Sequence, residues 1–435
     1  MSTLLNKVVF GALIAVIVLT PIPYGTVEPW WKAAFVCAVF AISILALIEN
    51  LSTANTEIRG KPVLLPMLAL TALAFLQTLS LGSRTEANLQ VWNTISADPY
   101  QTRFFALQLL SLTVFLALLY RYANTERRVR VLVYTVLTIA VVSAVFGILR
   151  QTTQQQTGFI LPLLRPKQGY AQFINKNHFA YLMEMAFGLG LGIILGGGVK
   201  RDRVMIYVAL LFPIWTALVF ANSRGGVLAM ITQIVIAMLL FTRARSVALR
   251  AVLLVVLLVG IVFGTLWVGG DRLASNFEGA SSEFTSDTSR QGASRNEIWR
   301  ATLKMFAAHP IVGVGMGGYW IGITAYHDAS GLMTPQEAHN DYLELLSSGG
   351  VIGFALGIWF VVMIVKEARA SFLKGSSYMR AVRFGAILGI AGVAAHSLVD
   401  FGLHIMTNAV VFLTLIMIAT TELSPAKAQR RKEES

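Results

Sequence analysis

The stretch "VRVLVYTVLTIAVVSAVFGIL" (Val129 to Leu149) decides the fold, because its 21 residues include a single charged side chain and are long enough to cross a bilayer as a helix. The whole chain of 435 residues is 56% hydrophobic and only 13% charged. A soluble domain carries roughly a quarter charged residues. The composition therefore predicts an all-α, polytopic membrane protein and excludes an ordinary soluble enzyme.

Eleven further apolar stretches bring the predicted number of membrane helices to twelve. The twelve span roughly residues 7–23, 30–48, 63–81, 104–121, 129–149, 178–197, 204–221, 225–241, 250–268, 343–365, 384–399 and 404–421. We expect four regions: transmembrane helices 1–9 (residues 1–268), a partly helical loop (269–342), transmembrane helices 10–12 (343–423) and a tail (424–435). The single cysteine, Cys37, excludes an intrachain disulfide.

The positions of Lys and Arg predict the orientation of the helices. With the N-terminus inside, the inside segments hold 22 of the 35 Lys and Arg residues, and the short outside loops hold 8. The positive-inside rule discounts the remaining five, which lie in the long loop. We therefore expect both termini in the cytoplasm and residues 269–342 in the periplasm. The net charge of +13 is spread over seven inside segments, so it indicates topology rather than nucleic-acid binding.

The cationic side chains on the outside form a second pattern. They include Arg150, Lys176 and Arg224, besides Arg165 and Lys167 in one loop and five residues of the long loop. A cationic outer vestibule suits an anionic ligand presented from the outer leaflet. Contact with lipid headgroups is the alternative for each of these residues.

Two helices are predicted in and after the long loop. Ser294 and Glu297 form a capping box before an apolar stripe, which predicts a helix from about Arg295 to Ala308. Thr334 and Glu337 predict a second capping box, with Pro335 in the first turn and a stop or bend at Gly349-Gly350. The glycine-rich "GVGMGGYW" (residues 313–320) lacks the frame of a nucleotide loop and predicts a close backbone turn under the ligand.

Three side chains outside the membrane suggest a site for an anion beside a base. Arg224 follows a tight turn, where Asn222 or Ser223 can cap the next helix, and Arg295 lies at a second helix start. Free N–H groups and the macrodipole at helix N-termini favour anions, and Arg suits bidentate contact with phosphate. His339 also lies near a helix start, where the same field favours the neutral imidazole that a general base needs.

Several motifs resemble the O-antigen ligase and polymerase superfamily of bacterial envelope glycosyltransferases. They are "NSRGGVLAM" (222–230), "SRNEIWRATLKMFAAHPIVGVGMGGYW" (294–320), "EAHNDYLELLSSGGVIGFALG" (337–357), "FINKNHFAYL" (173–182) and "HSLVDFGLH" (396–404). The resemblance covers roughly residues 165–405. It implies a GT-C type glycosyltransferase of the inner membrane that acts on the periplasmic side without a metal or other cofactor.

The resemblance also implies roles for individual residues. The family's two pyrophosphate-binding arginines match Arg224 and Arg295, its essential histidine matches His339, and a late acidic residue matches Asp400 with looser spacing. Five further residues are expected to support the site: Arg150, Lys176, His178, Asn340 and Asp341. Structural roles are alternatives for His178 and for Glu184, which lies inside the sixth predicted span.

The implied reaction transfers O-antigen from undecaprenyl pyrophosphate to a sugar hydroxyl of lipid A–core, with inversion, in lipopolysaccharide assembly. A polymerase of repeat units and a protein O-glycosyltransferase would use the same donor. The expected twelve spans with one long loop before the tenth favour the ligase. A transporter of a lipid-linked glycan is the rival from another class. It is disfavoured because most spans carry no ionisable residue and no inverted repeat is evident.

Overall fold

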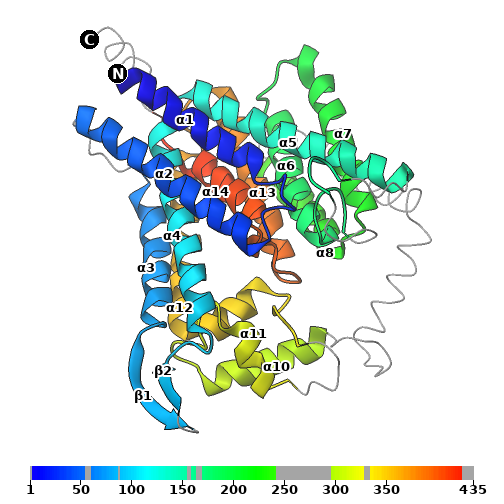
Figure 1. The fold of residues 1–435 in the computed structure, drawn as a ribbon. Coiled ribbons are helices and arrows are strands. Elements are labelled where there is room, and N and C mark those ends of the chain that lie inside the picture. Colours follow the sequence, from blue (N-terminus) through cyan, green and yellow to red (C-terminus); the bar gives the residue numbers. More distant parts are fainter. Residues whose placement is uncertain are drawn as a thin grey trace.

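The computed structural model describes residues 2–53, 60–86, 89–153, 158–162, 169–241, 295–327 and 334–423. Its architecture is a bundle of helices with one small hairpin (Figure 1). The predicted span at 250–268, the cap at Ser294, and Arg165 and Lys167 lie outside the described residues.

Thirteen α-helices and one two-stranded sheet make up the regular structure of the described residues. In chain order they are α1 (Ser2–Leu19), α2 (Pro29–Thr53), α3 (Lys61–Leu76), β1 (Ser80–Glu86), β2 (Leu89–Thr94), α4 (Pro99–Tyr122), α5 (Glu126–Thr153), α6 (Lys176–Leu195), α7 (Val204–Phe220), α8 (Arg224–Phe241), α10 (Arg295–Ala308), α11 (Tyr319–Gly322), α12 (Asp341–Ser371), α13 (Ser377–His396) and α14 (Met406–Thr420). Three single 3-10 turns, η1 (Arg201–Arg203), η2 (Ile323–Ala325) and η3 (Gly402–His404), join them.

Eleven of the twelve predicted spans coincide with helices. Among the described residues, seven helical segments are long and apolar enough to cross a membrane, by length and composition, and α1, α3, α8 and α14 are shorter apolar helices. The antiparallel hairpin β1–β2 was not predicted, so the expectation of an all-α fold holds except for this one hairpin between α3 and α4.

The core of the bundle is the contact between α6 and α13. Helix α6 is buried along nearly its whole length. A Cβ atom added at Gly192 would lie 2.2 Å from the Cα atom of Gly385 on α13. Small residues let helix backbones approach this closely and pack without a large side chain between them. The ends of α6 and α13 therefore have fixed relative positions, which matters for the site described below.

Polar contacts tie the helix ends together at one end of the bundle. Glu49 at the end of α2 accepts hydrogen bonds from Arg121 and Tyr122 at the end of α4. Across the same end, Ser376 donates a hydrogen bond to Glu126 and Lys374 pairs with Glu422. The start of α1 also lies at this end, opposite β1–β2, α10 and α11 (Figure 1). The arrangement is compatible with the predicted topology, in which both termini share one side.

The opposite end carries α10, α11 and the hairpin. The side chain of Gln77, after α3, donates to the carbonyl oxygens of Val312 and Ser348 and accepts from the amide of Met316. The glycine-rich segment turns closely against α12 there: a Cβ atom at Gly313, whose φ is +69°, would lie 2.4 Å from the carbonyl of Ser348. The prediction of a close backbone turn is confirmed, and its neighbours are protein backbone.

The predicted helix beginning near Pro335 is wrong. Helix α12 begins at Asp341, because the side-chain oxygen of Asn340 caps it by accepting from the amides of Tyr342 and Leu343. His339 has a φ of +49°, which a right-handed helix cannot continue through. The predicted bend is confirmed at Gly350, whose φ of +63° interrupts α12. The other predicted helix, Arg295–Ala308, matches α10.

Candidate active site

His339 lies in a turn between α11 and α12 that is held on both sides. We call residues 337–341 the His339 turn. Its last residue, Asp341, donates its backbone N–H to the carbonyl of Ser397 and accepts from the Ser397 hydroxyl at 2.6 Å. The side chain of Asn340 donates to the carbonyl of Leu398. The turn is thus joined to the end of α13, and the positive φ of His339 stores roughly 1–3 kcal/mol of strain that these contacts must offset.

The imidazole of His339 faces the carboxylate of Asp400. Its Nδ1 lies 3.3 Å from an oxygen of Asp400, and the side chain of His339 is 35% exposed whereas that of Asp400 is 1% exposed. With Nδ1–H donated to the carboxylate, Nε2 keeps its lone pair for a proton from a substrate. A buried carboxylate that orients an accessible imidazole is the arrangement of a general base and its positioning partner.

Asp400 is held as an anion. Burial alone would raise the pKa of Asp400, but the hydrogen bond from His339 and the neighbouring histidines lower it to about 2. Asn177, at the start of α6, also donates to it. The match of Asp400 to the late acidic residue therefore has a geometric counterpart, since Asp400 contacts the predicted base directly.

The aromatic ring of Phe401 lies between three imidazoles. Its centroid is 4.9 Å from that of His339, 5.0 Å from that of His178 and 6.0 Å from that of His404. His178 is buried, and its Nε2 has no hydrogen-bond partner. The structure thus places His178 in the wall of the site behind Phe401, without direct contact to His339 through a hydrogen bond.

Arg224 comes to this end of the bundle through α8. Ser223 caps α8 by accepting from the amide of Gly226, which confirms one of the two predicted caps, and Asn222 makes the turn with a φ of +50°. The next residue, Gly225, packs directly on His396, because a Cβ atom there would lie 2.1 Å from the His396 ring. His396 ends α13 one turn before Asp400, so Arg224 begins α8 beside the segment that holds the base.

Arg295 comes to the same end through α10. Trp299 lies one turn after it, and the indole Nε1 of Trp299 donates to the carbonyl of Ala338 at 3.0 Å. Residues four apart share a helix face, so Arg295 lies on the face of α10 that is directed toward the His339 turn. Both arginines are half-buried rather than fully solvated.

The other predicted residues have more local roles. Arg150 donates to the carbonyl of Ala171 at 2.6 Å and so fixes the end of α5 to the turn before α6. Lys176 is the exposed first residue of α6. Asn340 caps α12, and Asp341 contacts Ser397, as described above. Of these four residues, Asn340 and Asp341 belong to the His339 turn and attach it to the end of α13.

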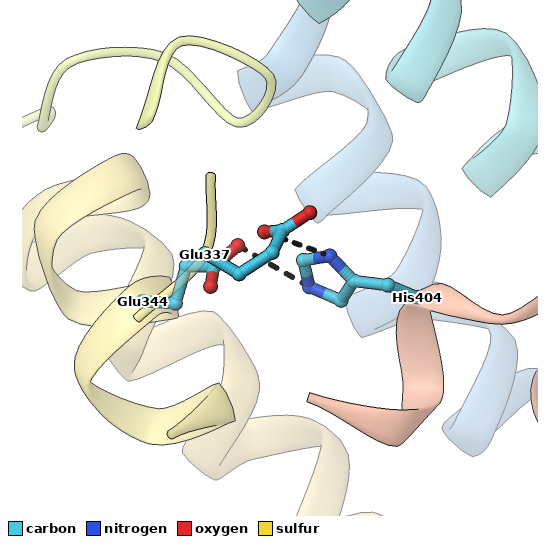
Figure 2. Close-up of side chains that lie close together, drawn as sticks. All are labelled: Glu337, Glu344 and His404. Atoms are coloured by element: carbon cyan, nitrogen blue, oxygen red, sulfur yellow. Dashed lines mark ion pairs between the residues drawn. The ribbon is translucent and has the colours of Figure 1, made fainter. Parts of the chain in front are cut away.

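A cluster that we did not anticipate lies beside the His339 turn (Figure 2). His404 pairs through Nδ1 with Glu337 at 3.4 Å and through Nε2 with Glu344 at 3.4 Å. Our sequence analysis predicted no metal ligands, yet the fold brings these three side chains within 4.8 Å of one another. His404 and Glu344 both occur in motifs quoted above, but 60 positions separate them in the sequence and no local spacing connects them.

The carboxylates of the cluster favour the protonated form of His404. Burial would lower the pKa of His404, but Glu344, Glu337 and Asp341 raise it to about 10. A protonated imidazole has no lone pair to offer a metal, and both ring nitrogens already face carboxylates. The imidazolium of His404 thus occupies the position in which a cation would neutralise Glu337 and Glu344.

Glu184 has a bundle-interior role in the structure. Its carboxylate lies 2.8 Å from Nδ1 of His396, and both side chains are fully buried. The ring of Tyr181 stacks on His396 with centroids 3.9 Å apart. The pair therefore positions His396, the residue against which Gly225 and the start of α8 pack.

One known family matches part of the chain. Residues 206–358, from α7 into α12, match a family model described as O-antigen ligase, and this range contains Arg224, Arg295 and His339. No curated protein matches the chain. This match over residues 206–358 supports membership of the O-antigen ligase superfamily.

Proposed function

We propose that the protein transfers a glycan from undecaprenyl pyrophosphate to a sugar hydroxyl of lipid A–core on the periplasmic side of the inner membrane. The observation that carries the proposal is the pairing of an accessible His339 with a buried, ionised Asp400. The start of α8, which carries Arg224, packs on His396 at the end of α13. The face of α10 that carries Arg295 adjoins the His339 turn.

The step is a direct displacement at the anomeric carbon of the donor. The acceptor hydroxyl oxygen forms the new C–O bond, its proton passes to Nε2 of His339, and the bond to the pyrophosphate oxygen breaks with its electron pair. Asp400 stabilises the imidazolium that forms. A single displacement without a covalent intermediate inverts the configuration of that carbon.

The leaving pyrophosphate requires compensation of its charge. Arg224 and Arg295 each lie at a helix N-terminus, where guanidinium groups, free N–H groups and the macrodipole act together on an anion. Cationic groups preorganised around developing charge typically supply the largest part of such stabilisation. In this proposal the arginines perform the role that Mg²⁺ performs in other pyrophosphate-dependent enzymes, and no metal is required.

A cavity near the site suits the hydrocarbon of a lipid-linked substrate. It has a volume of about 280 Å³, lies among α3, α4, α12 and α14, and is lined mainly by apolar side chains such as Met67, Leu112 and Phe412. Asp341, Glu344 and His404 form part of its wall. The cavity therefore connects an apolar surface for a chain with the polar groups beside His339.

The test is transfer by the purified protein alone in proteoliposomes. Undecaprenyl-pyrophosphate-linked glycan and lipid A–core are supplied, and we expect a glycan attached to lipid A–core, unchanged by EDTA. Growth of the glycan on the donor lipid would identify a polymerase instead. Absence of any new glycosidic bond, with both substrates shown to bind, would contradict the proposal.

A further inference from the structure

We propose that His404 is a positioning residue. Its ring contacts Glu337, Asp341 and Glu344, on both sides of His339, and so holds His339 in the position that transfer requires. We call these contacts the His404 clamp. The proposal deepens the proposed function and rests on it. It concerns a residue outside the part of the chain that matches the family model, residues 206–358.

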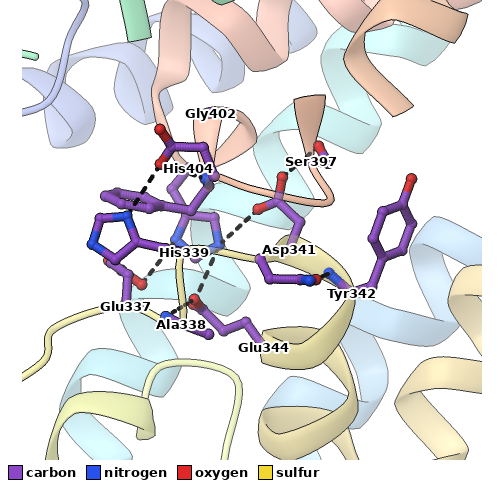
Figure 3. Close-up of polar contacts among 12 residues, drawn as sticks. Glu337, Ala338, His339, Asp341, Tyr342, Glu344, Ser397, Gly402 and His404 are labelled. Atoms are coloured by element: carbon purple, nitrogen blue, oxygen red, sulfur yellow. Dashed lines mark hydrogen bonds and ion pairs between the residues drawn. The ribbon is translucent and has the colours of Figure 1, made fainter. Parts of the chain in front are cut away.

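The clamp is formed by contacts on both sides of His339 in the sequence (Figure 3). Glu337, two residues before His339, faces Nδ1 of His404, whereas Asp341, two residues after it, lies 3.8 Å from Nε2. Glu344, in the first turn of α12, faces the same Nε2 at 3.4 Å. One ring therefore connects the segment before the base, the segment after it and the helix that follows.

Glu344 extends the clamp to the backbone of the turn. Its second carboxylate oxygen accepts from the amide of Ala338 at 2.9 Å. Ala338 is also the residue whose carbonyl accepts from Trp299 of α10. A displacement of Glu344 would therefore alter the residue adjacent to His339 and the contact that relates Arg295 to it.

The clamp requires a positive charge. Glu337, Asp341 and Glu344 are three acidic side chains around one ring, and none of them is more than 28% exposed. Burial would raise the pKa of Glu337, but the charge and hydrogen bond of His404, with Glu344 and Lys32, lower it to about 2. Closely spaced carboxylates repel one another unless a cation lies between them. Lys32 of α2 acts on Glu337 through its charge, whereas His404 contacts acidic side chains on both sides of His339.

The strain at His339 gives the clamp a function. A non-glycine residue with a φ of +49° persists only where its surroundings enforce it. The Asp400 side of the turn is held by Ser397 and Leu398. The Glu337 side is held by His404. Loss of the ring would remove its contact with Glu337 and its contact with Glu344, which bonds to the turn. Ala338 would keep its hydrogen bond from Trp299, and the second half of the turn would stay attached to α13.

The experiment compares His404→Gln, His404→Arg and the control His309→Gln, which changes an exposed histidine near the end of α10. We expect His404→Gln to lower kcat by on the order of 10- to 100-fold with the KM for the donor nearly unchanged, as a small misplacement of a catalytic group does. His404→Arg keeps the cation and should recover a large part of kcat. The control should behave as the wild type.

A double substitution tests the partner of the clamp. If His404 acts by holding Glu337, Glu337→Gln should lower kcat on its own and add little to His404→Gln. The Glu337→Gln variant also tests the proposal if His404→Gln does not fold. In Glu337→Gln, Asp341 and Glu344 remain paired with the His404 ring. Full kcat in Glu337→Gln together with full kcat in His404→Gln, or His404→Arg no better than His404→Gln, would overturn the proposal. Stimulation of the wild type by Mg²⁺ that is lost in His404→Gln would replace the clamp with a metal site.

Amide hydrogen exchange separates this proposal from the function on which it rests. Exchange at residues 337–341 should rise in His404→Gln and not in His309→Gln, whether or not transfer is observed. If the wild type forms no glycosidic bond, the proposed function fails and the exchange result decides the clamp. If the wild type is active and exchange in His404→Gln is unchanged, the clamp fails and the function stands.

Discussion

His339 combines three properties that rarely occur together in one residue. Its side chain is one-third exposed, its Nδ1 faces a buried carboxylate, and its backbone has a left-handed conformation. Strain of this kind concentrates at functional sites, where neighbouring contacts enforce it. At the residue scale, the site is therefore a strained turn whose two halves are held by different groups: Ser397, Leu398 and Asp400 on one side and His404 on the other.

The two arginines should not tolerate lysine. Arg224→Lys and Arg295→Lys keep the charge but lose the planar fork that contacts two phosphate oxygens at once. We expect transfer to fall substantially in each, and substitution by Ala to remove about 2–4 kcal/mol of transition-state stabilisation. Initial rates in proteoliposomes measure this. Full activity in both lysine variants would show that the pyrophosphate is stabilised by other groups.

The stability of the protein should depend on pH through His404. The pKa of His404 is raised to about 10 by Glu344, Glu337 and Asp341, with Lys32 nearby on the Glu337 side. In the unfolded chain the pKa of His404 returns to about 6.5. The stabilisation from the raised pKa is therefore complete below about pH 6.5 and is lost as the pH rises toward 10. We therefore expect the difference in Tm between the wild type and His404→Gln to shrink over this interval.

The matched control for this measurement is His309→Gln. Its Tm should follow the wild type at every pH, because His309 is exposed and contacts no carboxylate among the described residues. A difference in Tm between wild type and His404→Gln that stays constant from pH 6 to 10.5 would contradict the ion pairs of His404.

Sequence patterns predicted the elements that carry the candidate site residues better than the contacts among those residues. His339, Arg224 and Arg295 each follow a helix-start pattern or a matched motif, and the structure brings their elements to one end of the bundle. Asn177, Phe401 and His404 were not assigned roles, because their partners lie up to 223 positions away. Long-range contacts of this kind arise from the packing of α6, α12 and α13 and leave no local spacing in the sequence.

At the scale of elements, the start of α8 depends on a glycine. A Cβ atom at Gly225 would lie 2.1 Å from the ring of His396, which Glu184 and Tyr181 hold in place. Gly225→Ala must therefore displace α8 or the end of α13. We expect transfer to fall by on the order of 10-fold or more, since either movement misplaces Arg224 or Asp400.

The control for Gly225→Ala is Gly11→Ala in α1, where an added Cβ atom meets nothing within 4 Å. Alanine in a helix interior is more stable than glycine by roughly 0.5–1 kcal/mol, so this variant should be at least as stable as the wild type and fully active. Activity and Tm of the two variants, measured side by side, check the prediction. Normal activity in Gly225→Ala would show that the site tolerates movement of α8.

The length of the apolar stretches and the capping patterns predicted most helices. Two elements were predicted wrongly or missed: the helix start near Pro335 and the hairpin β1–β2. The eleven described helices at predicted spans follow from continuous hydrophobicity, which needs no partner to be recognised. The capping pattern at Thr334 and Glu337 failed because the Glu337 side chain pairs with His404 and is not available as a cap. The hairpin β1–β2 has no strong alternation of apolar residues, so the sequence pattern did not indicate it.

At the scale of the whole molecule, the orientation is open to a direct test. Thr324, in η2 directly after α11, and Asp202, in η1 directly before α7, are exposed. The predicted topology puts position 324 in the periplasm and position 202 in the cytoplasm. In a Cys37→Ser background, we expect a cysteine at position 324 to react with a membrane-impermeant maleimide in cells with a permeabilised outer membrane. A cysteine at position 202 should react only after the inner membrane is opened. The reverse pattern would invert the predicted topology.

The measurement that tests the central claim most directly is single-turnover transfer by His339→Ala in proteoliposomes, with donor binding measured on the same preparation. The account predicts that the donor still binds, because the arginines remain, and that no glycan reaches the acceptor, because the base for its hydroxyl is gone. Tm close to that of the wild type would confirm that the fold persists. A His339→Ala variant that transfers glycan at the wild-type rate would contradict the account.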